Sequence, residues 1–165
     1  MSKANSVIIN GWCIFAHSIF LDQFEEMILQ VDNIRLRDLL HYKEKNQTKR
    51  LAAVIKLIFE KIPNDPTLPE YRLGATLGKQ YKHWFRVKFF QQYRIFFRYH
   101  LASKIIIYAW INDEKTKRSY DSQSDAYYMF KKMLKTGRPP DDWKVLLAEA
   151  QGHTDRFRKY QVNEP

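Results

Sequence analysis

Three consecutive segments form the centre of this sequence: Trp84-Phe-Arg-Val-Lys-Phe-Phe90, Tyr93-Arg-Ile-Phe-Phe-Arg-Tyr99 and Lys104-Ile-Ile-Ile-Tyr-Ala-Trp-Ile-Asn112. Cationic and apolar residues alternate along the first two segments, and successive side chains of a strand point to opposite faces of a sheet. We therefore predict three consecutive strands with short connections, which form an antiparallel meander. One face then carries an apolar row (Val87, Phe89, Ile95, Phe97) and the other a cationic row (Arg86, Lys88, Arg94, Arg98).

Residues 71–112 have an unbalanced charge. They contain eight Lys or Arg residues and no Asp or Glu, in a chain whose net charge is +10, and they hold 12 of its 25 aromatic residues. Cations and aromatic rings without carboxylates suit a polyanion with stackable bases. An anionic membrane is the weaker alternative, because no basic amphipathic helix dominates the sequence. An ordinary solvated sheet face is the structural alternative for the cationic row.

The rest of the chain predicts helices around this meander. Apolar residues recur at helical spacing before and after it, and proline and glycine mark the breaks. The expected elements are a strand over residues 7–15 bent at Gly11, a helix from Ser18 to about Val31, a second helical piece over 34–42, a helix over 45–62 that stops at Pro63, a loop over 63–78, a loop over 113–120, a helix around 126–134 and a last helix over 141–151.

These elements predict an α+β fold with the order β-α-α-β-β-β-α and an extra C-terminal helix. The two early helices need a partner for their apolar stripes, so we expect them to cover the apolar row of the sheet. The helices would thus pack on one sheet face and leave the cationic face open. The length favours one domain, over residues 1–151, followed by a mobile tail over 152–165.

Several classes of protein are excluded by composition. Cys13 is the only cysteine, so neither an internal disulfide nor a cysteine-ligated zinc site is possible, which fits a reducing cytoplasm. No apolar run approaches the length of a membrane span, and the first residues lack the apolar region of a signal peptide. We expect a cytoplasmic protein with no membrane partner, no metal and no cofactor.

The same segments resemble a known family. Gly78-Lys-Gln-Tyr-Lys-His-Trp84 and the three strand segments, with Ile107-Tyr-Ala-Trp-Ile-Asn-Asp-Glu114, look like the YhaV toxin family. Shorter matches lie toward both ends: Asn10-Gly-Trp12, Phe15-Ala-His17, Asp125-Ala-Tyr127, Met133-Leu-Lys135 and Pro139-Pro-Asp-Asp-Trp143. Each motif alone is weak, but together they are specific and extend over about residues 10–150.

The resemblance implies a RelE-like toxin of a type II toxin–antitoxin system. Such toxins are small endoribonucleases that cut mRNA, many of them on the ribosome. The partner implied for this family is an AbrB-like antitoxin of the PrlF type. Binding to operator DNA, and repression of the toxin's own operon, would belong to the toxin–antitoxin complex.

Cleavage of RNA without a metal needs a base for the 2′-hydroxyl, cations for the phosphorane and an acid for the leaving 5′-oxygen. By the resemblance, Arg94 of the Tyr93-Arg94 pair contacts the scissile phosphate, which its planar fork can hold through two oxygens. Arg86 and Lys88 lie on the neighbouring strand, and Arg118 and Tyr120 resemble residues placed near the reacting nucleotide. The general base stays open among four residues (Lys88, Tyr120, His17, Asp113).

A second group of residues is expected to bind RNA around this site: Arg98, Lys82, His83, Trp110, Asn112 and His17. Structural roles compete for several of them, since Trp110 suits a core, Asn112 a strand end and His17 a satisfied buried histidine. Two functions follow. The first is an endoribonuclease toxin, and the second is a non-catalytic RNA- or ribosome-binding module that inhibits translation through the same face.

Overall fold

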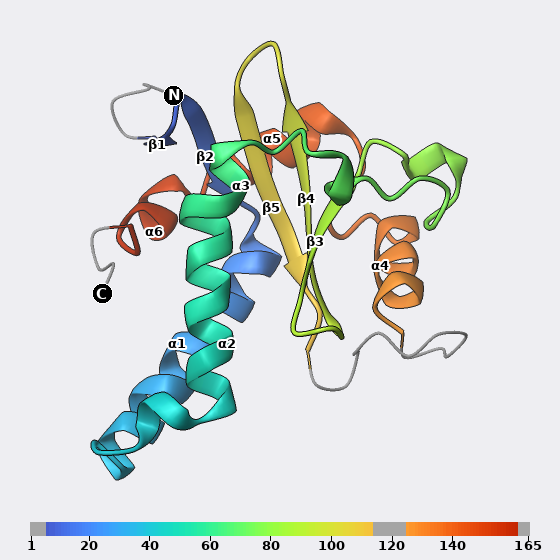
Figure 1. Ribbon diagram of the computed structural model, residues 1–165. Helices are drawn as coiled ribbons and strands as arrows, with labels where there is room; N and C mark the ends of the chain where they lie inside the picture. Colours follow the sequence, from blue (N-terminus) through green and yellow to red (C-terminus); the bar gives the residue numbers. More distant parts are fainter. Residues whose placement is uncertain (1–5, 114–124, 162–165) are drawn as a thin grey trace.

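The computed structural model describes residues 6–113 and 125–161 (Figure 1). Its strands are β1 (Val7–Ile9), β2 (Trp12–Ala16), β3 (Phe85–Phe89), β4 (Tyr93–His100) and β5 (Ile105–Ile111). Its α-helices are α1 (Ser18–Arg37), α2 (Asn46–Lys56), α3 (Ile62–Asn64), α4 (Ala126–Lys135), α5 (Trp143–Gln151) and α6 (Thr154–Arg158). A π-helical segment, η3 (Leu57–Lys61), joins α2 to α3, and single 3₁₀ turns are η2 (Tyr42–Glu44), η4 (Pro69–Tyr71) and η5 (Lys79–Tyr81). The predicted α+β class is confirmed.

The five strands form one mixed sheet in the order β1-β2-β5-β4-β3. The meander β3–β4–β5 is antiparallel, as predicted, and Val87 pairs with Ile95 and Lys88 with Arg94. β2 pairs in parallel with β5. A parallel pair needs a long connection, and here that connection contains α1, α2 and the meander's first two strands. The sheet therefore brings the first strands of the chain beside its central hairpin.

The front of the chain is a hairpin, and the prediction of one bent strand over residues 7–15 is wrong. Val7–Ile9 pairs antiparallel with Trp12–Ile14 across the two-residue turn Asn10-Gly11. Both turn residues have positive φ, 51° for Asn10 and 81° for Gly11. This is the backbone that an Asn-Gly dipeptide adopts in a tight hairpin, where it reverses the strand instead of bending it.

The early helices are longer than predicted. α1 continues without a break to Arg37, so the expected second piece over residues 34–42 belongs partly to α1 and partly to η2. The second helix also passes Pro63, where we expected it to stop. In the π-helical segment before it, the N–H of Ile62 bonds to the carbonyl of Leu57, and Pro63 stands in the first turn of α3, where a missing N–H is tolerated.

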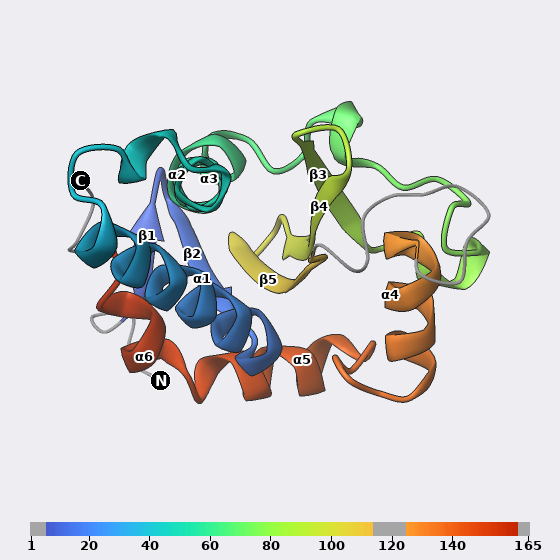
Figure 2. The same cartoon turned by 90° about the horizontal axis from the view of Figure 1, so that it is seen from below.

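Both faces of the sheet are covered. On one face α1, α2 and η3 pack against the predicted apolar row, Val87, Phe89, Ile95 and Phe97. On the other face α4 and α5 bury a second core, whose members include Phe96, Trp110, Phe130 and Leu146. Figure 2 shows α2 on one side of β5, and α5 on the other. The predictions that all helices pack on one face, and that the cationic face is open, are therefore wrong.

The physical reason lies in β5 and in Phe96. The run Ile105–Ile111 is apolar at every position, without the alternation of a half-exposed strand, and residues 106–111 are all buried. A strand of this kind needs cover on both faces. Phe96, in the middle of the cationic row, is fully buried and stacks on Phe130 of α4 at 4.2 Å between ring centroids.

Residues 152–161 also pack onto the body, in place of the mobile tail expected from Gly152. Phe157 of α6 is 1% exposed and stacks on Phe59 at 5.4 Å. Arg156 pairs with Asp22 and Glu25 of α1, and the Tyr160 hydroxyl donates to Glu25 at 2.5 Å. A short helix of this kind is stabilised by such tertiary contacts and not by its own length.

Within residues 6–113 and 125–161, none of the helices has the length and apolar character needed to cross a membrane.

Phe157→Ala tests the docking of α6. The change leaves a cavity between α6 and η3, so we expect the free energy of unfolding to fall by about 3–5 kcal/mol in urea titrations. Phe90→Ala is the matched control, because Phe90 is 54% exposed, and it should change the free energy by about 0.5 kcal/mol or less. Equal effects of the two variants would contradict the packing of α6.

The contact between α6 and α1 also predicts a pH dependence. The hydrogen bond from Arg156 lowers the pKa of Glu25 below its ordinary value of 4.5. The unfolded chain then binds this proton more tightly, so the contribution to stability is present above about pH 4.5 and is lost as the pH falls through the lowered pKa. We expect Glu25→Gln to lower the Tm at neutral pH and to differ less from the wild type near pH 3. A difference that stays constant with pH would refute this coupling.

Candidate functional site

Two arginines of neighbouring strands meet on one hydroxyl group. Arg94 Nε of β4 and Arg86 Nε of β3 both donate to Tyr127 Oη of α4, at 3.0 and 2.9 Å. Tyr127 is placed by Asp125, the N-cap of α4, whose carboxylate accepts from the Tyr127 N–H at 3.1 Å. The predicted pair Arg86 and Arg94 is thus brought together, by a residue that the sequence analysis had not assigned to the site.

The remaining contacts of the two guanidinium groups are with backbone carbonyls. Arg94 Nη1 donates to the carbonyl oxygens of Gln91 at 2.6 Å and Tyr93 at 2.9 Å. Arg86 Nη1 donates to two carbonyls of the preceding loop, Glu70 at 3.0 Å and Arg72 at 2.8 Å. Within the part of the chain that the structure describes, neither arginine contacts a carboxylate.

This arrangement leaves a positive charge that the described residues do not compensate. Arg94 is 4% exposed, and burial of a guanidinium without an anionic partner is unfavourable even when its hydrogen bonds are satisfied. Lys88 lies opposite Arg94 in the β3–β4 register, and its side chain is exposed. A buried arginine beside an exposed lysine can attract and hold an anion such as a phosphate.

Asn112 fixes the backbone of Arg94 within this cluster. Its side-chain oxygen accepts from the Arg94 N–H at 2.6 Å, and its Nδ2 donates to the Gln92 carbonyl at 2.9 Å. It is fully buried and ties the end of β5 to the β3–β4 turn. Asn112, expected from the sequence to bind RNA, thus reaches the site through the backbone of Arg94.

Arg98 lies apart from the Arg86–Arg94 cluster. It stands between the rings of Trp84 and Trp143, at 5.4 and 5.1 Å, and donates to the Asp141 carbonyl at 2.5 Å. Burial lowers the pKa of Arg98, and the carboxylates of Asp141 and its neighbour Asp142 oppose that effect. The side chain of Phe96 separates Arg98 from Arg94 along β4.

His83 belongs to the same neighbourhood as Arg98. Its Nε2 lies 2.6 Å from Asp141 Oδ1, which also accepts from Trp84 Nε1 at 2.7 Å. Lys82, directly before it, is exposed. These residues surround the junction between η5 and the start of α5, and the structure does not join them to the Arg86–Arg94 cluster.

His17 and Trp110 take part in the second core and its rim. The side chain of His17 caps α1 by accepting from the Ile19 N–H at 3.2 Å, and its Nε2 lies 3.0 Å from Glu149 Oε1. His17 is 1% exposed, and both ring nitrogens are thereby used. Trp110 is 6% exposed and stacks on Phe130 at 5.7 Å. The structure places neither residue at the cluster around Tyr127.

Arg118 and Tyr120 lie outside the described residues. Among the residues that are described, no three His, Cys, Asp or Glu side chains gather as metal ligands would. Tyr127 is the site residue that the sequence analysis missed. Its motif, Asp125-Ala-Tyr127, was noted for the resemblance, but no spacing rule relates a helical tyrosine to arginines that precede it by 33 and 41 residues.

Comparisons with known proteins give one consistent result. Residues 14–151 match the model of the YhaV toxin family, described as a toxin with endonuclease activity, of a toxin–antitoxin system. The chain is 43% identical over 145 residues to the ribonuclease toxin YhaV of Escherichia coli K12, a match that covers 87% of this chain and 94% of the relative. The toxin YhaV of Escherichia coli O157:H7 gives the same identity and coverage. No solved structure matches the chain, so the RelE-like fold stays a prediction.

Tyr127→Phe tests the role of the shared hydroxyl. The change keeps the ring but removes the acceptor of two guanidinium Nε groups, so we expect the free energy of unfolding to fall by about 1–3 kcal/mol. Tyr128→Phe, at the exposed neighbouring position of the same helix, should change it by about 0.5 kcal/mol or less. Urea unfolding followed by circular dichroism measures both, and a Tyr127→Phe variant as stable as the wild type would show that the hydroxyl does not hold the arginines.

Proposed function

The chain belongs to the YhaV family of toxins with endonuclease activity, and from this premise we propose that it is an endoribonuclease that cleaves mRNA in the cytoplasm, on the translating ribosome. The observation that carries the proposal is the pair of guanidinium groups on Tyr127 Oη, without a carboxylate partner among the described residues. A scissile phosphate would supply the missing negative charge. The arginines are already fixed by carbonyl and hydroxyl oxygens, so they need little reorganisation when charge develops.

The proposed reaction is a transfer within the RNA. The 2′-oxygen attacks the adjacent phosphorus, the bond from phosphorus to the 5′-oxygen breaks, and a 2′,3′-cyclic phosphate and a 5′-hydroxyl result. A base takes the 2′-proton and an acid returns one to the 5′-oxygen. Arginine, lysine and tyrosine side chains can stabilise the phosphorane directly, and as cations and neutral donors they are poor ligands for a metal.

Within this proposal each residue has a distinct part. Arg94 provides the buried positive charge beneath the phosphate, and Arg86 supports it through the same tyrosine. Lys88, exposed and opposite Arg94 in the strand register, contacts the phosphate and is a candidate acid or base, as is Tyr120. Arg118 and Tyr120 enter the proposal on the resemblance alone. Tyr127 is a positioning residue, because it acts through the arginines.

The proposed partners follow from the family. We expect the cognate antitoxin to be an AbrB-like, PrlF-type protein, and we expect operator DNA to be bound only by the toxin–antitoxin complex. A non-catalytic RNA- or ribosome-binding module is the alternative, since the same cations would serve binding alone. Discrete cleavage products separate the two functions, because only an enzyme leaves new 5′ ends.

Lys88→Gln is the variant that best tests the reaction. Arg94→Ala would abolish hydrogen bonds to two carbonyls and to Tyr127, so its effect would mix folding with chemistry. Lys88 is exposed, and its loss should reduce cleavage about 100- to 1,000-fold in a folded protein. Primer extension on an mRNA, with and without ribosomes, measures the new 5′ ends, and growth arrest on induced expression measures toxicity.

Two controls complete this test. Lys135→Gln removes an exposed lysine from the end of α4 and should leave cleavage and toxicity unchanged. An mRNA with a single 2′-deoxy nucleotide at the cut site should resist the wild-type protein, because the attacking hydroxyl is absent. Full cleavage by Lys88→Gln would remove Lys88 from the site, and growth arrest by the wild type without new 5′ ends would favour the binding module.

A further inference from the structure

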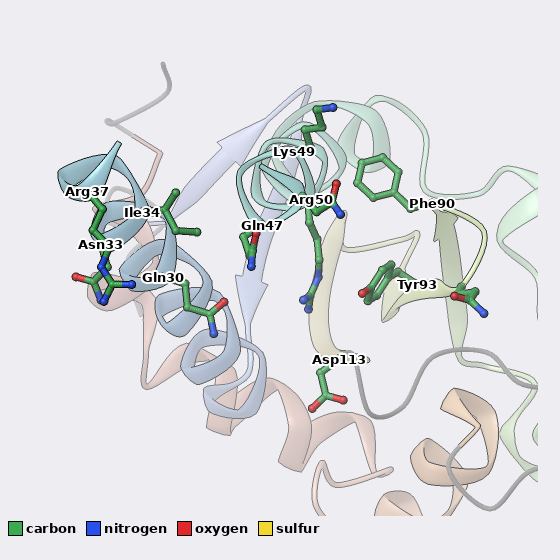
Figure 3. Close-up of a pocket in the computed structure, with 12 residues that line it drawn as sticks. Gln30, Asn33, Ile34, Arg37, Gln47, Lys49, Arg50, Phe90, Tyr93 and Asp113 are labelled. Carbon is green, nitrogen blue, oxygen red and sulfur yellow. The ribbon is translucent and has the colours of Figure 1, made fainter. Parts of the chain in front are cut away.

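A groove lies on the side of the β3–β4 turn opposite to the Arg86–Arg94 cluster. The end of α1, the start of α2, the turn at residues 90–92 and the end of β5 enclose it, with a volume of about 950 Å³. Five of the 12 side chains that line it are carboxamides and three are cations, against one carboxylate, Asp113. Figure 3 shows side chains of α1 and α2 on one side of the groove and Phe90 and Tyr93 on the other.

Arg50 carries a positive charge into this groove. Its guanidinium lies over the Tyr93 ring at 4.6 Å, and its Nη2 donates weakly to the Asn112 carbonyl at 3.3 Å. Its Nε is buried, and no described residue accepts from it. A buried donor without an acceptor is unfavourable, and here it belongs to an arginine that points into an open groove (Figure 3). The charged end of this arginine faces the groove, where it favours an anionic ligand.

Phe90 extends an aromatic ring at the rim. It is 54% exposed, and both Phe90 and Gln91 have positive φ, 47° and 63°. Bulky L-residues rarely adopt this backbone, and such conformations gather at functional sites. An exposed ring on a rigid turn, near a tyrosine already stacked with arginine, has the geometry of a platform for nucleic-acid bases.

The turn that bears Phe90 is shared by the groove and the catalytic cluster. The Gln91 carbonyl accepts from Arg94, while Gln92 lines the groove and its carbonyl accepts from Asn112. Asn112 in turn accepts from the Arg94 N–H. A strand of RNA with its phosphate at Arg94 would therefore need to cross only this turn to enter the groove.

We propose that the groove binds single-stranded RNA adjacent to the cleaved nucleotide, an inference that rests on the proposed endoribonuclease function. Phe90 and the guanidinium of Arg50 stack on bases, the carboxamides contact base edges, and Lys49 and Arg37 contact phosphates. Carboxamides and cations around a few rings match the chemistry of a nucleic acid. A docking groove for a protein helix would instead carry a continuous apolar lining.

RNA length and variants of the rim test the groove. Fluorescence anisotropy compares RNAs of about 4 and about 12 nucleotides, both 2′-O-methylated so that they cannot be cut. The longer RNA should bind the wild type more tightly. Phe90→Ala should weaken its binding about 5- to 100-fold and leave the short RNA unaffected. Leu101→Ala, on the opposite hairpin turn and also 54% exposed, should weaken neither.

A second pair of variants tests the positive charge of the groove. Lys49→Gln should reduce the dependence of log K on log salt by about 0.7 for the long RNA, the contribution of one phosphate contact to a single strand. Lys56→Gln removes an exposed lysine of the same helix outside the groove and should leave the salt dependence unchanged. Thermal unfolding of each variant confirms that the fold persists.

The outcomes separate this proposal from the proposed function. If the wild type cuts unmodified mRNA but Phe90→Ala binds the long RNA as tightly as the wild type, the groove proposal fails and the ribonuclease stands. If Phe90→Ala loses the purified antitoxin and keeps the RNA, the groove is a protein interface and the proposal is wrong. If the groove variants lose RNA while the wild type cuts none, the ribonuclease assignment fails and the groove remains an RNA site.

Discussion

The fold is built on β5, which is apolar on both faces, and on the adjacent β4, whose second face carries the buried Phe96 among its cations. β5 is buried from Ile106 to Ile111, and β4 has Ile95 and Phe97 on one face and Phe96 on the other. Exposure of either face to water would remove the hydrophobic stabilisation from several buried aromatic side chains, each of which buries a large apolar area. The chain therefore needs helices both before and after the meander, and α1 with α2 and α4 with α5 supply the two layers.

This double cover decides where the cations lie. Phe96 occupies the middle of the cationic row and stacks on α4, so the row is divided. Arg98 is enclosed by tryptophans toward α5, whereas Arg86, Lys88 and Arg94 gather near the start of α4. An open sheet would have had a continuous basic surface. The folded protein has instead a small cluster of cations at one end of the row, and such a cluster can bind one phosphate more specifically than a wide basic surface.

The chain treats its arginines in two ways. Arg156 joins α6 to α1, and the sequence provides it with Asp22 and Glu25, whose carboxylates raise its pKa. Arg50 and Arg94 lie around the end of β5 and the β3–β4 turn, and Arg86 lies near the start of β3. The described residues offer these three arginines carbonyls, a hydroxyl and a ring. Selection for stability of the folded protein alone would favour the first arrangement, in which an arginine pairs with carboxylates. The second leaves a positive potential that favours an anionic ligand.

The amino-acid sequence alone was enough to predict the meander, its alternating apolar and cationic rows, the hydrophobic match with the early helices and the family. These features depend on the local spacing of apolar residues, which follows the period of a strand or of a helix and can therefore be recognised in a sequence. It also contained the signal for the second core, because the uninterrupted apolar run Ile105–Ile111 requires cover on both faces. That α4 provides this cover, and that Tyr127 thereby contacts Arg86 and Arg94, became known from the three-dimensional structure. The groove beside Phe90 could not be predicted from the sequence either, since α1 and α2 form one part of it, and the turn and Asp113 that form the rest follow them by about 40–80 residues. Contacts between such distant segments depend on how whole layers of helices and strands pack together. The local spacing of apolar residues does not predict that packing.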